Sequence, residues 1–199
     1  AAQPGVQVHP PERKMGLRSS RTSAVSLENA HVPAANLLGT EGQGMKIALA
    51  TLDHSRLGIA AQSIGIAQGA VDEALSYARQ RSQFGVPLID HQAIAFRLAD
   101  MDTELAAARW LTYRGAWLSE QGSRHSRESA QAKLLASETA NRIVASAVQI
   151  HGGYGFSRDF AVERFYRDAR VTTIYEGTSE VQRMVIARAL RDHGDVVER

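Results

Sequence analysis

The chain contains no cysteine, which excludes disulfide bonds, thiolate metal sites, iron–sulfur clusters and a cysteine nucleophile. No apolar run approaches the roughly 20 residues needed to cross a bilayer, so we expect no membrane span. Residues 1–13 lack the hydrophobic core of a secretory signal. No HExxH, GxSxG or Walker A sequence occurs, and we expect no metal site. The net charge is only +2, from 23 basic and 21 acidic residues, so nothing in it indicates nucleic-acid binding.

The 199 residues are 44 % hydrophobic and 22 % charged, which is typical of a folded globular domain, alone or with a remnant of another. Arginine outnumbers lysine 20 to 3, and alanine is abundant. This usage suggests a bacterial genome rich in G and C, and hence a cytoplasmic protein, or one of the mitochondrial matrix if the source is eukaryotic. The sequence does not begin with Met, and we expect it to come from within a longer chain.

The first part of the chain has the pattern of short strands. Hydrophobic and polar residues alternate over Ala24–Glu28 and again around His31–Val32, and glycine and proline residues punctuate the segment. Two or three short strands are unlikely to form a stable sheet alone. We therefore expect residues 1–43 to be the end of an incomplete β-domain and residues 44–199 to be a helical domain.

From Met45 onwards, apolar residues recur at steps of three to five, which predicts helices. Asp90 is a plausible N-cap for the second helix, after Pro87. Three long helices and a shorter fourth, joined by short loops, predict a mainly α fold with an antiparallel four-helix bundle. Helices of about 30 residues span about 45 Å, so we expect them to bury a second face in an oligomer. The expected helices cover residues 45–81, 126–151 and 160–167; the second helix follows the Asp90 cap and ends near residue 120, and a last one starts near Thr178 or Ser179.

Residues 151–180 carry the features that point to chemistry. Gly152, Gly153 and Gly155 follow a long helix, where they serve either as a helix stop or as a place where a flat or phosphorylated ligand approaches the backbone. Glu176 lies between a β-branched run and a helix N-terminus, and Gly177 follows it. Partial desolvation there would make Glu176 a better proton acceptor. The alternative is a solvated loop residue stabilised by the helix dipole.

Several longer motifs occur in a fixed order along the chain. They read MGLRSSRT, VPAANLLGTEGQG, LDHSRLGIAAQSIGIAQGAVDEALSYARQRSQFGVPLIDHQ, VQIHGGYGF and RDARVTTIYEGTSEVQR. Together they resemble the C-terminal half of the acyl-CoA dehydrogenase family, namely the end of its β-domain and its C-terminal helical bundle. The resemblance covers all of this chain but only about half of the family's length.

The resemblance implies an FAD-dependent flavoprotein of fatty-acid β-oxidation, an oxidoreductase that removes hydrogens from Cα and Cβ of an acyl-CoA thioester. Glu176 occupies the position of the base that takes the α-proton, while the β-hydrogen leaves as hydride to the flavin. Some relatives carry the base on the first bundle helix, just before the arginine of DxxR. Here that position is Ser55, which cannot serve as the base. The Glu176 backbone N–H and a flavin ribityl hydroxyl would stabilise the enolate.

The resemblance also implies two sets of binding residues. The flavin would be held by Arg81, Ser82, Gln83, His91, Gln92, Gln149, Ile150, His151, Gly152, Gly153, Thr178, Ser179 and Glu180. The acyl-CoA would be contacted by Asp53, Arg56, Arg124, Ser126, Gly177 and Arg188. Structural readings stay open for several of them: an intrahelical pair for Asp53 and Arg56, a solvated Arg124, and a cap for Ser126.

The resemblance implies an electron-transfer flavoprotein as electron acceptor and a homo-oligomer, either a dimer or a tetramer. Two alternatives stay open. One is a relative of the acyl-CoA oxidases, which pass electrons to oxygen. The other is a helical oligomerisation module that keeps the motif residues without turnover. The preference for acyl chain length or branching is left open by this sequence.

Overall fold

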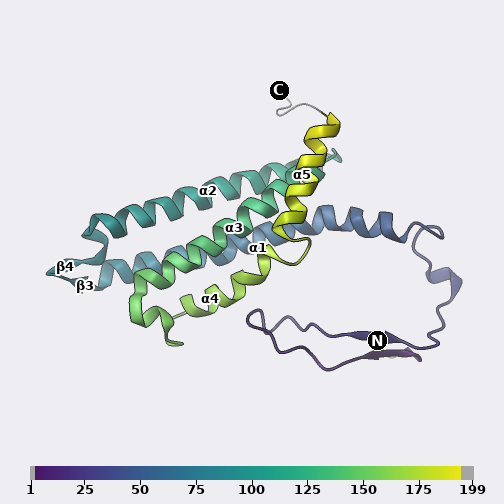
Figure 1. The fold of residues 1–199 in the computed structure, drawn as a ribbon, viewed down its shortest axis with the longest axis horizontal. Coiled ribbons are helices and arrows are strands. Elements are labelled where there is room, and N and C mark those ends of the chain that lie inside the picture. The colour runs from purple at the N-terminus through teal and green to yellow at the C-terminus, as the bar shows by residue number, and fades with distance from the viewer. Residues whose placement is uncertain (1–2, 194–199) are drawn as a thin grey trace. The chain divides into compact units, whose positions relative to one another are not determined.

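The computed structural model describes residues 3–193, and the chain is mainly helical (Figure 1). Contacts divide it into two compact units, Ala1–Thr51 and Leu52–Arg199. Within residues 3–193, none of the helices combines the length and the apolar character that spanning a membrane requires.

The first unit contains one small antiparallel pair of strands. β1 (Val6–Val8) pairs with β2 (Val25–Leu27), with Val6 opposite Leu27. β2 falls inside the segment predicted from the alternation. The expectation of a strand around His31–Val32 was wrong, because Asn29 turns the chain at a φ of +51° directly after β2, and a 3-10 turn, η1 (Ala34–Asn36), follows soon after. Residues 30–33, between these two turns, are not part of a strand.

The helices follow the predicted periodicity closely. α3 has both of its predicted ends, and α1 lies within one residue of its predicted ends. The helices are α1 (Gly44–Gln80), α2 (Gln92–Glu120), α3 (Ser126–His151), α4 (Val162–Ala169) and α5 (Ser179–His193).

The start of α2 differs from the prediction. Asp90 does not cap the helix, because it ends a short 3-10 turn, η2 (Leu88–Asp90). His91, with φ −79° and ψ 120°, is the extended residue that precedes the first helical turn. An N-cap must have this non-helical conformation, and Asp90 is already part of a turn.

A β-hairpin with strands of two residues each joins α1 to η2. It consists of β3 (Ser82–Gln83) and β4 (Val86–Pro87), and Phe84 and Gly85 form its turn with φ values of +53° and +87°. Two successive positive φ values define the tight hairpin turn that matches strand twist. The hairpin places the end of α1 next to the start of α2, as Figure 1 shows.

The core of the second unit is built largely from small side chains. α1, α2 and α3 contribute one apolar cluster to it. Alanine favours helix and keeps helices close together, since its side chain adds only a methyl group. The buried alanines are Ala60, Ala67, Ala70, Ala74 and Ala78 of α1, Ala108 of α2, Ala130, Ala132, Ala136, Ala140 and Ala147 of α3, and Ala169 of α4.

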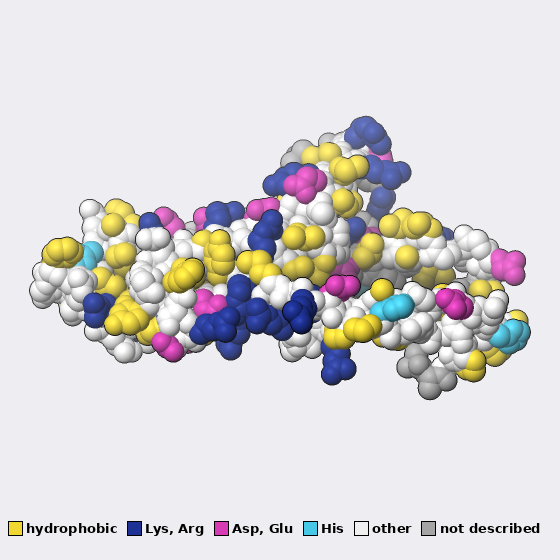
Figure 2. Space-filling view, turned by 60° about the horizontal axis from the view of Figure 1, so that its bottom comes forward, with side chains coloured by type: hydrophobic (Ala, Val, Ile, Leu, Met, Phe, Trp, Pro, Cys, Tyr) yellow, Lys and Arg dark blue, Asp and Glu magenta, His cyan; other side chains and the backbone are white. Residues whose placement is uncertain are grey.

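Large apolar side chains remain on the surface of this unit. Phe84 is 96 % exposed, Phe156 89 % and Trp110 71 %, and Trp117 and Phe96 are also exposed. Figure 2 shows hydrophobic side chains spread over one face of the molecule among arginines and lysines.

Candidate active site

The loop between η4 (Arg170–Thr173) and α5 carries Glu176 in an unusual backbone conformation. Glu176 has a φ of +56°, and Gly177 follows with a φ of +91°. A residue with a Cβ adopts a positive φ only at a cost of about 1–3 kcal/mol. The surroundings must therefore hold this loop, and their contacts identify the residues that do so.

Two fully buried side chains fix the loop through its carbonyl groups. Lys133 Nζ donates to the Gly177 carbonyl at 2.8 Å. Gln182 Nε2 donates to the same carbonyl at 2.8 Å and to that of Glu176 at 3.2 Å. Lys133 and Gln182 are both 0 % exposed, and burial is the main reason why the pKa of Lys133 falls from 10.5 to about 8. We call this arrangement the Lys133–Gln182 clamp.

Sequence reasoning missed both residues of the clamp. The only signal for Lys133 is its place among Ala132, Ala136 and Ala140, on the apolar face of α3, where a lysine needs a partner. Gln182 carries no comparable signal, since a glutamine in the first turn of a helix is ordinary.

The Glu176 carboxylate is half-buried and points toward α1. Ser55 Oγ donates a hydrogen bond to Glu176 Oε2 at 2.6 Å. The neighbouring Tyr175 donates its hydroxyl to Gln62 Oε1, also on α1, and burial raises the pKa of Tyr175. The loop is thus attached to α1 on both sides of the Tyr175–Glu176 peptide.

The predicted substrate residues Asp53, Arg56 and Ser126 meet one another. Arg56, which is 5 % exposed, donates to Asp53 Oδ1 at 2.6 Å, and Ser126 donates to Asp53 Oδ2. Ser55, which binds Glu176, lies between Asp53 and Arg56 in the sequence of α1. Ser126 begins α3, and its hydroxyl reaches across to α1 rather than capping its own helix.

Of the three remaining predicted substrate residues, Gly177 lies in the Glu176 loop, and the two arginines lie on the surface. Arg124 is exposed in the loop between α2 and α3. Arg188 is 78 % exposed and pairs with Asp192 on its own helix, at 3.6 Å.

A cavity of about 490 Å³ gathers many of the predicted flavin residues from three segments. The buried His151 stacks on Tyr77 with ring centroids 4.2 Å apart, and its Nδ1 contacts the Ala147 carbonyl at 2.8 Å. His151 Nε2 is buried and has no partner among residues 3–193. The cavity is lined by Tyr77, Arg81, Gln83, Leu88, Ile150, His151, Gly152, Gly153 and Tyr154.

The three glycines after α3 have different tasks. Gly152 and Gly153 line the cavity, and a Cβ on either would meet nothing within 4 Å, so open space lies beside their backbone. A Cβ on Gly155 would overlap the Val148 carbonyl and the His151 side chain, so Gly155 is required for packing. Gly152 is also the C-cap of α3, with a φ of +59°, so it stops the helix, while the open space beside Gly152 and Gly153 leaves room for a ligand at their backbone.

The remaining residues of the predicted flavin set near this cavity lie outside its lining. His91 Nε2 contacts the Gln83 carbonyl at 3.1 Å, so His91 supports the hairpin. The exposed residues Ser82, Gln92 and Gln149 lie on β3, at the start of α2 and near the end of α3.

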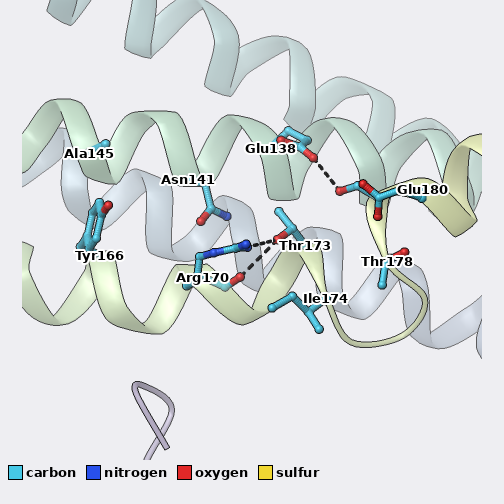
Figure 3. Close-up of a pocket in the computed structure, with 10 residues that line it drawn as sticks. Glu138, Asn141, Ala145, Tyr166, Arg170, Thr173, Ile174, Thr178 and Glu180 are labelled. Atoms are coloured by element: carbon cyan, nitrogen blue, oxygen red, sulfur yellow. Dashed lines mark hydrogen bonds between the residues drawn. The ribbon is translucent and has the colours of Figure 1, made fainter.

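Thr178, Ser179 and Glu180 line a second cavity, of about 430 Å³ (Figure 3). Ser179 Oγ donates to Glu138 Oε1 at 2.6 Å. Thr178 Oγ1 accepts from the Val181 backbone N–H at 3.4 Å and caps α5. Hydrogen bonds from its own backbone N–H and from Thr178 lower the pKa of Glu180. Within the described residues, no group of three or more His, Asp or Glu side chains is placed to bind a metal ion.

Comparison with known proteins identifies the family. The sequence model of the family described as acyl-CoA dehydrogenase, C-terminal domain, matches residues 42–191. The chain is 52 % identical to the caffeyl-CoA reductase–Etf complex subunit CarC of Acetobacterium woodii, over 94 % of this chain and 49 % of that protein. It is 50 % identical to an acyl-CoA dehydrogenase of Bacillus subtilis, over 94 % of this chain and 49 % of that protein.

The structural comparison agrees. Butyryl-CoA dehydrogenase from Megasphaera elsdenii superimposes with a TM-score of 0.94 at 47 % identity, over 96 % of this chain and 50 % of that one. The chain spans about half the length of the curated relatives it matches. Sequence and structure thus agree that the chain belongs to the acyl-CoA dehydrogenase family.

Proposed function

We propose that the protein containing this chain catalyses the α,β-dehydrogenation of an acyl-CoA thioester with FAD, and that Glu176 is the base. The observation that carries this proposal is the Glu176 loop. Its carboxylate is half-buried, and its backbone is held in a strained conformation by the Lys133–Gln182 clamp. Strain of this kind is kept where a side chain must be presented at one place.

The protein's part of the reaction is to orient the thioester and to move one proton. The Glu176 carboxylate takes the proton from Cα, and its backbone N–H donates to the thioester carbonyl, where negative charge develops. FAD, when bound, accepts the hydrogen and electron pair that leave Cβ. The product is the α,β-unsaturated acyl-CoA, and Glu176 later returns its proton to solvent.

The cavity between α1, the hairpin and the end of α3 suits the dinucleotide part of FAD. The Arg81 guanidinium can pair with phosphate oxygens, and the open space at Gly152 and Gly153 lets a phosphate reach the backbone. The unpartnered Nε2 of His151 supplies a buried polar atom for a ligand group. Thr178 and Ser179, at the N-terminus of α5, would hold the part of FAD closer to Glu176.

The acyl-CoA would lie along α1 and the start of α3. Asp53, Arg56 and Ser126 form a hydrogen-bonded polar group on α1 and the start of α3, and Gly177 would contact the thioester through the backbone of the loop that carries Glu176. Arg124 and Arg188 are exposed cations that can meet the phosphates of CoA.

We further propose a homo-oligomer that passes its electrons to an electron-transfer flavoprotein. The exposed aromatic residues Phe84, Phe156 and Trp110 supply an apolar surface for a second copy. CarC, named as a subunit of a reductase–Etf complex, supports the choice of electron acceptor.

The name of CarC also favours a second candidate, the reverse reaction, in which an unsaturated acyl-CoA is reduced. The same residues serve this direction, because a protonated Glu176 can return its proton to Cα.

The test uses the visible absorption spectrum of the protein after loading with FAD and removal of the excess. Anaerobic addition of acyl-CoAs should bleach the flavin band with one chain-length class, and E176Q should retain FAD but bleach far more slowly. Flavin retention without bleaching in the wild-type protein would refute the dehydrogenase function. Reoxidation of the reduced protein by enoyl-CoA would measure the reverse reaction.

A further inference from the structure

The Ser55 side chain makes a hydrogen bond outside its own helix. Its hydroxyl lies 2.6 Å from Glu176 Oε2 and 3.3 Å from the carbonyl of Leu52. A helical serine commonly donates to a carbonyl in the preceding turn, but here the shorter bond crosses to a residue 121 positions away. A hydrogen bond of this length to a carboxylate is in the charge-assisted range and is stronger than a neutral one.

We propose that Ser55 is the positioning residue of the base, a role that rests on the proposed function of Glu176. Ser55 binds one carboxylate oxygen, Oε2. The other oxygen, Oε1, has no hydrogen-bond partner among residues 3–193. The carboxylate is thereby held by one oxygen and presents the other to the α-proton.

The charged groups nearby do not compete for the carboxylate. The ammonium group of Lys133 donates to the Gly177 carbonyl, and the Arg56 guanidinium donates to Asp53. Neither group donates a hydrogen bond to the Glu176 carboxylate within the described residues. Ser55 is therefore the side chain whose hydrogen bond fixes the direction of the Glu176 carboxyl group within the described residues.

A hydroxyl is suited to this task in both charge states of the base. It donates to the carboxylate before the reaction. After proton transfer to Oε1, Oε2 is the carbonyl oxygen of the neutral acid and still accepts a hydrogen bond from the Ser55 hydroxyl. The carboxyl group then keeps its place throughout turnover.

The test compares S55A, S55T and a control, S76A, in the FAD-loaded protein. Ser76 is an exposed serine on the same helix, outside the site. We expect S55A to slow flavin reduction by acyl-CoA about tenfold, the effect of one hydrogen bond to a charged group. The dissociation constant for acyl-CoA should change less than about twofold, and S55T should restore most of the rate, because only the direction of the base is altered.

The double variant S55A/E176Q separates positioning from a structural role. Once the base is removed, S55A should leave the residual rate of flavin reduction unchanged, because Ser55 acts through Glu176. A wild-type rate for S55A, or an equal slowing by S55A in the E176Q background, would overturn the role of Ser55. A wild-type rate for E176Q would refute the base assignment itself, and the role of Ser55 with it.

Discussion

Replacing Gly177 by alanine tests how tightly the active-site loop is built. The φ of +91° costs a residue with a Cβ about 1–2 kcal/mol. The added Cβ would also lie 2.7 Å from Gln182 Nε2. Gln182 is fully buried, so its amide must shift and weaken its hydrogen bonds to the two loop carbonyls, at about 1 kcal/mol each. We expect G177A to lower the free energy of unfolding by about 3–4 kcal/mol.

Gly122, in the turn between α2 and α3, supplies the matched control. Its φ is +66°, and a Cβ there would meet nothing within 4 Å. G122A should therefore show the backbone cost alone, about 1 kcal/mol. Urea unfolding followed by far-UV circular dichroism measures both variants, and equal slopes with denaturant keep the comparison valid. If G177A loses no more stability than G122A, the contact with Gln182 does not constrain the loop and the reasoning is wrong.

Two further predictions concern buried charges. Between pH 8 and about 9.5 the folded protein releases the Lys133 proton, whereas the unfolded chain, in which the pKa of this lysine is 10.5, keeps it. The free energy of unfolding should therefore rise with pH over this range, by up to about 2 kcal/mol. Urea titrations at several pH values should show this rise in the wild type, and K133M should abolish it; a rise of equal size in K133M would disprove the assignment. D53N should destabilise the protein by about 2 kcal/mol in the same assay, because it leaves the buried guanidinium of Arg56 without its counter-charge, whereas an unchanged midpoint would mean that solvent replaces the carboxylate.

Periodicity predicts the helices well because each is long and is ended by clear signals. α3 ends at the Gly152–Gly153 pair, and α1 ends just before the hairpin. The short elements are less predictable. Asp90 looks like a cap by residue type, but η2 determines its backbone conformation. A strand at His31–Val32 fails because the turns around it leave no partner, and that information lies outside the alternation itself.

The candidate site divides in the same way. Glu176 and the flavin and substrate residues are proposed from family motifs, which record positions along the chain. Ser55, Lys133 and Gln182 contact the Glu176 loop from α1, α3 and α5. Contacts over such separations depend on how the helices pack. A sequence pattern carries no information on that packing, so the Lys133–Gln182 clamp can be identified only from the three-dimensional structure.

The alanine contacts of the bundle have a mechanical consequence. Where helices touch through methyl groups, no long side chain is available to change rotamer and absorb a displacement. Enlarging one of these positions must move a whole helix, and the loops at the helix ends move with it. α1 carries Ser55 and Gln62, which bind Glu176 and Tyr175, so a displacement of α1 would move these side chains relative to the loop. The bundle is therefore stiff, and substitutions can change the distance between its helices only by about the size of a methyl group at a time.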